Sequence, residues 1–472
     1  MNFNSLHFFA FLAVVLLLNQ LLAPRATYRK RMLLSASYYF YMCWDWRFAG
    51  LLFLVTLTTY TAAWRIAAAR TAAVRRLWLT LAIAICLGAL GSAKYADFFI
   101  ANLATLLGLF GWQADLPLLN VVLPVGISFF TFQSLSYVVD VYRGHAAPCP
   151  KFDDYAFFVA FFPTLLAGPI SRAGELIPQI EAAAPCTVQQ LESGWVLMLR
   201  GFIRKMAFAD VLAAHLVDPA FAKPEGYSPL FLLVALYGYS FQIYMDVAGY
   251  TDIARGMARM IGFELRPNFD RPYLANSVSA YWQRWHMTVS RFFRDYLFIG
   301  LGGSRTGNVY ANVMLTFLAI GLWHGAGWNF VLYGFVHGSV VCVERWRRSA
   351  RAGSTPARDP PGWRLPLQII ITFHIIAFLR ILFRSADVGA AITYVEAMFN
   401  FGEQAAAPFD VVGLAVLALA AIAHVVPRSK SDLLLNHFIR WPVAAQAMSI
   451  VLTTYLLLAL SASEQAFAYF RF

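Results

Sequence analysis

The sequence predicts an all-α polytopic membrane protein, and its composition and patterning lead to that fold class. Of the 472 residues, 60% are hydrophobic and only 13% are charged, against about 25% charged in an ordinary soluble domain. The apolar residues fall in blocks, several of them long enough to cross a bilayer. Basic residues cluster at the ends of these blocks, as expected for cytoplasmic loops. The net charge of +12 is therefore mostly a topology signal, and we expect no nucleic-acid partner.

The first apolar block, residues 8–23, predicts a membrane helix that is retained, because it lacks the basic start and the cleavage site of a signal peptide. Basic residues follow at 25–31, so the N-terminus is expected outside, in a periplasm or extracellular space. A second basic cluster lies at 65–76. The further segments expected to cross or enter the membrane up to residue 142 are 33–42, 51–63, 77–90, 96–110 and 119–142.

Residues 157–180 are apolar, but Pro163, Gly168, Pro169 and Pro178 interrupt them too often for one straight helix. A broken or re-entrant segment is predicted. Such backbone is tolerated at membrane depth only when it is buried in protein or lines a watery cavity, so we expect it near a functional cavity. A surface loop between helices is the alternative.

Two basic loops, residues 344–364 and 428–440, bracket the C-terminal part of the chain. Between them, residues 365–382 and 411–426 are expected to make one excursion outward and back. Residues 443–460 then cross once more, which places the C-terminus outside.

Residues 279–299 have the pattern of one amphipathic helix. An apolar stripe carries Trp282, Trp285, Val289, Phe292 and Tyr296, and the opposite face carries Arg284, Arg291 and Asp295. We therefore expect residues 264–305 to form a cytoplasmic region in the membrane interface, with its arginines toward lipid headgroups. His286 borders the stripe and should point into the protein, either as a packed, hydrogen-bonded histidine or as a catalytic one.

Residues 306–343 predict a hairpin, because the apolar segments on either side of the sequence GLWHGAGWN both end in charged loops. His324 then lies at the apex, and an ionisable residue inside a membrane indicates a functional site. Gly325 and Gly327 allow close approach of a substrate or of another backbone, while Trp323 and Trp328 can exclude water. A neutral imidazole in such a site can act as a base. The alternative is a structural histidine, which His337 on the returning helix favours more strongly.

Asp246 and Asp252 end an apolar run, so we expect them to be paired, with Arg255 as one candidate partner. Proton relay, donor positioning and a structural ion pair all remain open for them. The five cysteines show no metal-ligand spacing, so neither a zinc site nor a disulfide framework is predicted.

At these residues the chain resembles the membrane-bound O-acyltransferase (MBOAT) superfamily, and within it the branch of bacterial alginate O-acetyltransferases and relatives that acetylate other secreted polysaccharides. The motifs that carry the resemblance span nearly the whole chain. They are LPVGISFFTFQSLSYVVDVYRG at 123–144, AGPISR at 167–172, YMDVAGYTDIARG at 244–256, NFDRPY at 268–273, YWQRWHMTVSRFFRDYLFIGLGG at 281–303, LWHGAGWNFVLYGFVHG at 322–338 and the tail FAYFRF.

The resemblance implies that His324 is the catalytic histidine embedded in the membrane and that His286 is the second histidine, in a cytoplasmic funnel. It also implies one membrane domain over residues 1–472, built as a ring of about 11 transmembrane helices with re-entrant and interfacial helices around that funnel. The acyl donor enters from the cytoplasm, and the acetyl group passes to periplasmic acetyltransferase or acceptor proteins. No permanently bound cofactor and no metal site are implied.

The expected function is an O-acetyltransferase subunit in a bacterial inner membrane, with acetyl-CoA as the donor and a secreted polysaccharide such as cellulose or alginate as the acceptor. Arg284, Arg291 and Arg294 are expected to attract the donor phosphates beside Trp282 and Trp285. The residues expected to support the reaction are Trp323, Gly325, Asn329, Asp246 and Asp252. D-alanyl or other acyl transfer to a cell-envelope polymer is an alternative, and so is a transporter, although no internal inverted repeat is seen.

Overall fold

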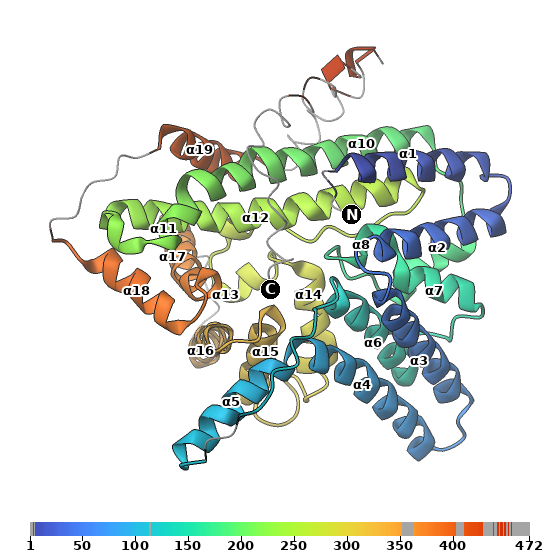
Figure 1. The fold of residues 1–472 in the computed structure, drawn as a ribbon, viewed down its shortest axis with the longest axis horizontal. Helices are drawn as coiled ribbons and strands as arrows, with labels where there is room; N and C mark the ends of the chain where they lie inside the picture. Colours follow the sequence, from blue (N-terminus) through green and yellow to red (C-terminus); the bar gives the residue numbers. More distant parts are fainter. Residues whose placement is uncertain are drawn as a thin grey trace. The chain divides into compact units, whose positions relative to one another are not determined.

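The computed structural model describes residues 3, 5–112, 115–351, 362–402 and 410–427, together with isolated positions between 438 and 455. In this part of the chain every regular element is a helix, which confirms the all-α prediction (Figure 1). Four of these helices are long and apolar enough to span a membrane, namely α3 (Phe48–Ala68), α4 (Ala72–Lys94), α12 (Pro229–Met260) and α17 (Arg364–Arg384). The ring of about 11 helices remains a prediction.

The chain divides into two compact units. Unit 1 comprises Met1–Trp195 with Ala254–Arg266, and unit 2 comprises Val196–Ile253 with Pro267–Phe472. Besides α3 and α4, the helices of unit 1 are α1 (Leu6–Leu21), α2 (Ala26–Met42), α5 (Ala96–Leu109), α6 (Ile127–Arg143), α7 (Phe152–Ala160), α8 (Phe162–Leu165) and α9 (Ala173–Ala182), and α10 (Val188–Phe202) begins in it.

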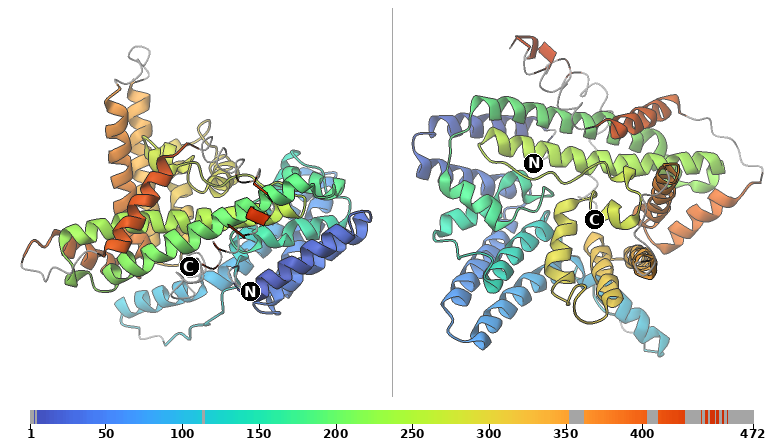
Figure 2. Two further views of the ribbon diagram at one scale, coloured as in Figure 1. Left: turned by 90° about the horizontal axis from the view of Figure 1, so that it is seen from above. Right: turned by 180° about the vertical axis from the view of Figure 1, so that it is seen from behind.

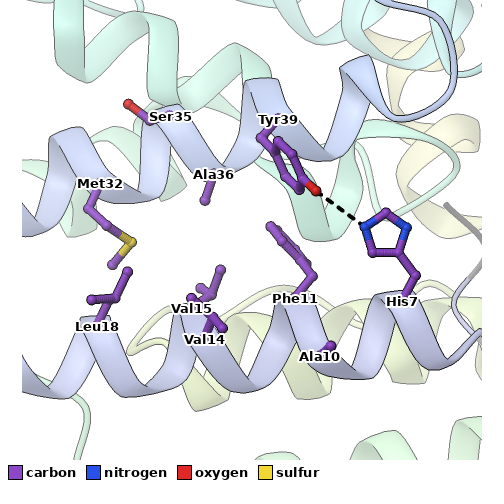
Figure 3. A pocket seen from close by; sticks show the side chains of 10 residues that line it. All are labelled: His7, Ala10, Phe11, Val14, Val15, Leu18, Met32, Ser35, Ala36 and Tyr39. Carbon is purple, nitrogen blue, oxygen red and sulfur yellow. Dashed lines mark hydrogen bonds between the residues drawn. The ribbon is translucent and has the colours of Figure 1, made fainter.

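Helices α1 and α2 of unit 1 pack side by side and leave a groove of about 520 Å³ between them (Figure 3). The groove has apolar walls, and His7 Nε2 lies 3.2 Å from Tyr39 Oη at one end. The basic cluster at 25–31 forms the N-terminal cap and the first turns of α2. There Lys30 Nζ lies 2.5 Å from Asp154 Oδ1, and the buried Arg29 donates to the carbonyl of Ala184. Charges assigned to topology from the sequence therefore anchor α2 to later segments of unit 1.

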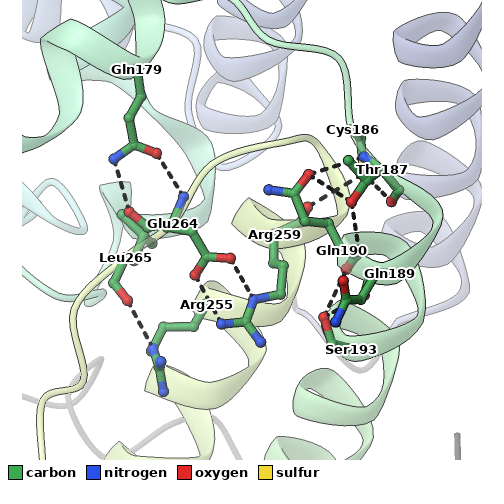
Figure 4. Close-up of polar contacts among 10 residues, drawn as sticks. All are labelled: Gln179, Cys186, Thr187, Gln189, Gln190, Ser193, Arg255, Arg259, Glu264 and Leu265. Atoms are coloured by element: carbon green, nitrogen blue, oxygen red, sulfur yellow. Dashed lines mark hydrogen bonds and ion pairs between the residues drawn. The ribbon is translucent and has the colours of Figure 1, made fainter.

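The predicted break within residues 157–180 is confirmed, because α7 ends at Ala160, the short α8 follows, and α9 begins only at Ala173. The chain from Phe157 to Ile170 is buried, so the alternative of a surface loop is wrong. Polar side chains fix the segment that follows. Gln179 exchanges hydrogen bonds with the backbone of Glu264, and the Glu264 carboxylate pairs with Arg259 (Figure 4).

Unit 2 contains most of α12, all of α17 and the candidate site. Its other elements are the π-helices η1 (Ile203–Asp210), η2 (Ala213–Val217) and η5 (Phe293–Phe298), the short turns η3 (Pro224–Gly226) and η4 (Pro272–Leu274), and the α-helices α11 (Asp218–Ala222), α13 (Val278–Trp282), α14 (Met287–Phe292), α15 (Val309–His324), α16 (Trp328–Arg351), α18 (Val388–Phe399) and α19 (Val411–Val425). Helix α18, between α17 and α19, was not predicted, since only residues 365–382 and 411–426 were expected to form helices in this part of the chain. The predicted helix over 443–460 lies outside the continuously described residues.

The prediction of one amphipathic helix over residues 279–299 is wrong, because the chain leaves the helical path between α13 and α14. Hydrogen bonds from a neighbouring segment replace the helical ones at this point. The amide of Asp270 donates to the carbonyl of Arg284, and the amide of Met287 donates to the carbonyl of Asn268. The apolar stripe itself is confirmed as the inward face, since Trp282, Trp285 and their partners along it are mostly buried.

Within the range of the predicted hairpin, α15 and α16 pack along each other and are joined by a three-residue turn, and α16 continues beyond residue 343 to Arg351. Glycines make this close packing possible. A side chain at Gly334 would clash with the carbonyl of Phe317, and one at Gly321 would clash with the carbonyl of Phe330. Helix α16 also lies beside α17, and Figure 2 (left) shows these two orange helices from the side.

Candidate functional site

His324 is the last residue of α15 and lies at the turn of the hairpin, with only 4% of its surface exposed. Aromatic rings surround the imidazole. Its ring centroid is 4.6 Å from Trp323, 4.8 Å from Phe383 and 5.9 Å from Tyr333. Trp323 is therefore part of the wall that excludes water, whereas Trp328 is 58% exposed and lies outside this wall.

The turn after His324 is fixed by packing. A side chain at Gly325 would clash with the ring of Phe330, so the space beside this residue is filled by protein. Asn329 donates from Nδ2 to the carbonyls of Leu382 and Ser385, at 3.2 and 3.0 Å, and thereby ties the end of α17 to the turn. These two hydrogen bonds hold Phe383 against His324, which gives the asparagine after the glycine-rich turn a structural role.

His286 is fully enclosed and occupies the break between α13 and α14, with φ 43° and ψ 51°. This left-handed conformation is uncommon for a residue other than glycine and is associated with functional sites. Asn268 stabilises the turn. Its Oδ1 accepts hydrogen bonds from the amide and the hydroxyl of Thr288, each at 3.0 Å, and its Nδ2 lies 3.0 Å from His286 Nδ1.

These contacts define the tautomer of His286. Because Asn268 Oδ1 accepts from the amide of Thr288, the Nδ2 of Asn268 must be the atom that faces the imidazole, and it can only donate. His286 Nδ1 is therefore the acceptor and Nε2 carries the proton. Burial also lowers the pKa of His286 to about 3. At neutral pH the ring is uncharged and presents an N–H donor at Nε2.

The structure brings the two candidate histidines to the same tryptophan. Trp323 lies 5.7 Å from the ring of His286 and 4.6 Å from that of His324, measured between ring centroids. A second connection lies far from the turn of the hairpin, on α16. There the Glu344 carboxylate accepts hydrogen bonds from the amides of Val278 and Ser279. Residues that are 38 positions apart in the sequence thus form one buried site.

The two tryptophans expected beside the donor are structural parts of this site. Trp282 Nε1 donates to His337 Nδ1 at 3.2 Å, which is consistent with a structural His337. Trp285 stacks on Tyr281 at 5.6 Å, and the guanidinium of Arg380 lies 4.4 Å above its ring. Sequence reasoning did not single out Arg380, although an arginine inside the apolar run 365–382 was a signal for it.

The three arginines expected at the donor entrance lie toward the surface. Arg284 and Arg291 are half-buried, and Arg294 has a side chain that is 61% exposed and pairs with Asp295 at 2.6 Å. Such exposure suits long-range attraction of an anionic molecule more than a fixed hydrogen bond. A role in donor binding remains a prediction for all three.

Asp246 and Asp252 are both paired, as predicted. Asp246 lies 2.7 Å from the buried Lys205 Nζ, and Asp252 makes a two-pronged pair with Arg200, with 2.9 Å for each contact. Arg204 adds a third contact to Asp252. These partners give both carboxylates a structural role on α12, so they explain the burial of the charges without a proton relay.

The fold and the site define a helical membrane protein with a buried histidine pair suited to acid–base or nucleophilic chemistry. The model of MBOAT, the membrane-bound O-acyltransferase family, matches residues 143–383, which include both histidines. The chain belongs to this family and is an O-acyltransferase.

Similar proteins cover most of the chain. The probable alginate O-acetylase AlgI of Azotobacter vinelandii is 37% identical over 426 residues, which are 89% of this chain and 83% of that protein. The protein with the same description in Pseudomonas aeruginosa is 39% identical over 403 residues, 84% of this chain and 75% of that protein. A peptidoglycan O-acetyltransferase of Helicobacter pylori is 33% identical over 429 residues, 84% of this chain and 79% of that protein.

Proposed function

We propose that this protein transfers acetyl groups from acetyl-CoA toward the hydroxyls of a secreted polysaccharide, with His324 as the reacting histidine. The observation that carries the proposal is the pair of buried histidines on one tryptophan, in a chain whose relatives carry the descriptions alginate O-acetylase and peptidoglycan O-acetyltransferase. A neutral, water-excluded imidazole can accept a proton from a hydroxyl group or attack a thioester itself.

Two routes satisfy the chemistry at His324. In the first, the acceptor oxygen attacks the thioester carbon while its proton passes to His324, and the carbon–sulfur bond breaks to release a thiolate that takes up a proton. In the second, an imidazole nitrogen attacks the thioester and expels the thiolate. The acceptor oxygen then displaces the imidazole from the acetyl group and loses its proton.

His286 acts as a hydrogen-bond donor in this proposal. Its Nδ1 accepts from Asn268, so the proton is carried by Nε2, and this N–H group orients the carbonyl oxygen of the donor. A role as a general base would require the opposite tautomer. In this proposal Arg284, Arg291 and Arg294 attract the phosphates of acetyl-CoA at the cytoplasmic side, and the basic charge of the 264–305 region supports that placement.

The charge pattern and the relatives support the setting that we propose for the reaction. We place the protein in a bacterial inner membrane with its N-terminus in the periplasm, in contact with membrane lipids. Periplasmic acetyltransferase or acceptor proteins receive the acetyl group. Alginate, cellulose and another exopolysaccharide are the candidate polymers, and D-alanyl transfer to a cell-envelope polymer is the alternative acyl transfer.

The test is release of CoA from acetyl-CoA by the purified protein in lipid nanodiscs. Wild type should consume the thioester, and His324→Ala should lose at least about 10²-fold of that rate while it remains folded. His337→Gln is the matched control, because it alters a buried histidine of the same hairpin and keeps an acceptor for Trp282. Turnover of D-alanyl thioester in place of acetyl-CoA would support the alternative donor. A folded His324→Ala protein with wild-type turnover would contradict the proposal.

A further inference from the structure

Arg380 on α17 is a buried arginine in the interior of unit 2, with 3% of its surface exposed. Aromatic side chains surround the guanidinium group. It lies 4.4 Å above the ring centroid of Trp285 and 5.6 Å from that of Tyr273, and its Nη2 donates to the hydroxyl of Tyr281 at 2.9 Å. An arginine remains charged in a protein, so this is a fixed positive charge.

The charge of Arg380 has no carboxylate partner among the described residues, and its buried Nε has no hydrogen-bond acceptor among them either. One turn further along α17, Arg384 shows the ordinary arrangement, since its Nη2 lies 2.7 Å from Asp218 Oδ1. A buried ion without a counter-ion is costly, and cation–π contacts offset only part of that cost. An uncompensated charge at this position therefore indicates an anionic partner that arises during function.

The position of Arg380 identifies that partner. Phe383, three residues later on the same face of α17, contacts His324, and Trp285 beneath the guanidinium is the chain neighbour of His286. Asn329 fixes this end of α17 to the turn of the hairpin.

We propose that Arg380 stabilises the oxyanion that forms during acyl transfer at His324. The inference rests on the proposed function. When a nucleophile attacks the thioester carbon, the electron pair of the carbonyl double bond moves to oxygen and gives a tetrahedral intermediate with one negative charge. That pair returns to the carbonyl as the carbon–sulfur bond breaks and the thiolate leaves. Both routes at His324 pass through this oxyanion, and a preorganised guanidinium in a dry site stabilises it.

The experiment compares Arg380→Met, Arg380→Lys and Arg384→Met in nanodiscs, by CoA release from acetyl-CoA and by thermal unfolding. Arg380→Met should lower kcat by about 10²–10³-fold with a change in KM below about threefold. Its Tm should equal or exceed that of wild type, because an uncompensated charge is removed. Arg380→Lys should recover at least about tenfold of the lost kcat, since it restores a positive charge. Arg384→Met should show the reverse, with a lower Tm and nearly unchanged kcat, because it breaks the pair with Asp218.

Three results would overturn the assignment of Arg380. They are a kcat of Arg380→Met within about threefold of wild type, a rise in KM alone, and a fall in Tm that accounts for the lost activity, as expected for a structural anchor. Failure of the proposed function is distinguishable from these results. It would appear as no CoA release by wild type, and the thermal comparison, which needs no substrate, would still report whether the charge of Arg380 is uncompensated.

Discussion

The strongest test of the site concerns Asn268, because this one side chain both stabilises the turn at His286 and selects its tautomer. Asn268→Ala removes three hydrogen bonds, two from Thr288 and one to His286. At about 0.5–1.5 kcal/mol for each, the free energy of unfolding should fall by about 1.5–4.5 kcal/mol. Asn268→Asp keeps an acceptor for Thr288, so its stability should lie closer to that of wild type.

The aspartate variant separates stability from chemistry. A carboxylate accepts and cannot donate, so it requires a proton at His286 Nδ1 and leaves Nε2 without one. A wrong histidine tautomer lowers kcat by about 10⁴-fold in serine proteases, and we expect a loss of about 10²–10⁴-fold here. The assay is CoA release in nanodiscs beside thermal unfolding, with ¹⁵N solid-state NMR of the imidazole to identify the protonated nitrogen.

The control for this test is Thr288→Val, which removes one hydrogen bond to Asn268 Oδ1 and leaves the contact with His286 in place. It should cost about 1 kcal/mol of stability and keep most of the activity. An Asn268→Asp protein that shows the shifted proton by NMR and still releases CoA at the wild-type rate would contradict this role, because His286 would then not act through Nε2–H.

Three further predictions concern pH, packing and salt. Burial lowers the pKa of His286 from 6.5 to about 3, so the unfolded chain binds a proton that the folded one does not. Stability should therefore fall as the pH drops from 6.5 toward 3, and His286→Ala should flatten this slope in thermal unfolding measured against pH. Gly334→Val should lower Tm sharply, since its side chain meets the carbonyl of Phe317; an unchanged Tm would contradict the packing. Arg284→Ala and Arg291→Ala should raise the KM for acetyl-CoA, most at low ionic strength, and equal KM values at every salt concentration would exclude them from donor binding.

The sequence predicted the features that depend on pattern. The apolar blocks, the broken segment after Phe157 and the hairpin around His324 were all visible because helix breakers and charged ends mark them. The burial of Trp282 and Trp285 followed from their spacing on one stripe. These properties depend on neighbours along the chain, so a single sequence contains them.

Features that depend on contacts between distant segments were not predictable in the same way. The break at His286 arises because the backbone of residues 268 and 270 bonds to the backbone on both sides of this histidine, in place of helical partners. A histidine in the left-handed conformation has no signature in the sequence. The partners of Asp246 and Asp252 come from η1 and the end of α10, about forty to fifty residues away. The sequence shows Arg380 as an arginine inside an apolar run, but only the structure shows that no described carboxylate pairs with it.

The length of α15 has a consequence for where a polymer-bound hydroxyl can be reached. Its 16 residues rise by about 24 Å, whereas the hydrocarbon core of a bilayer is about 30 Å thick. In the proposed topology, which puts the 264–305 region on the cytoplasmic side, His324 would stop several ångströms short of the opposite headgroups. A hydrophilic acceptor must then descend below the outer surface, or the lipid must thin around the hairpin. The acyl chain length of the surrounding lipids thus becomes a determinant of acceptor access, independent of any residue in the site.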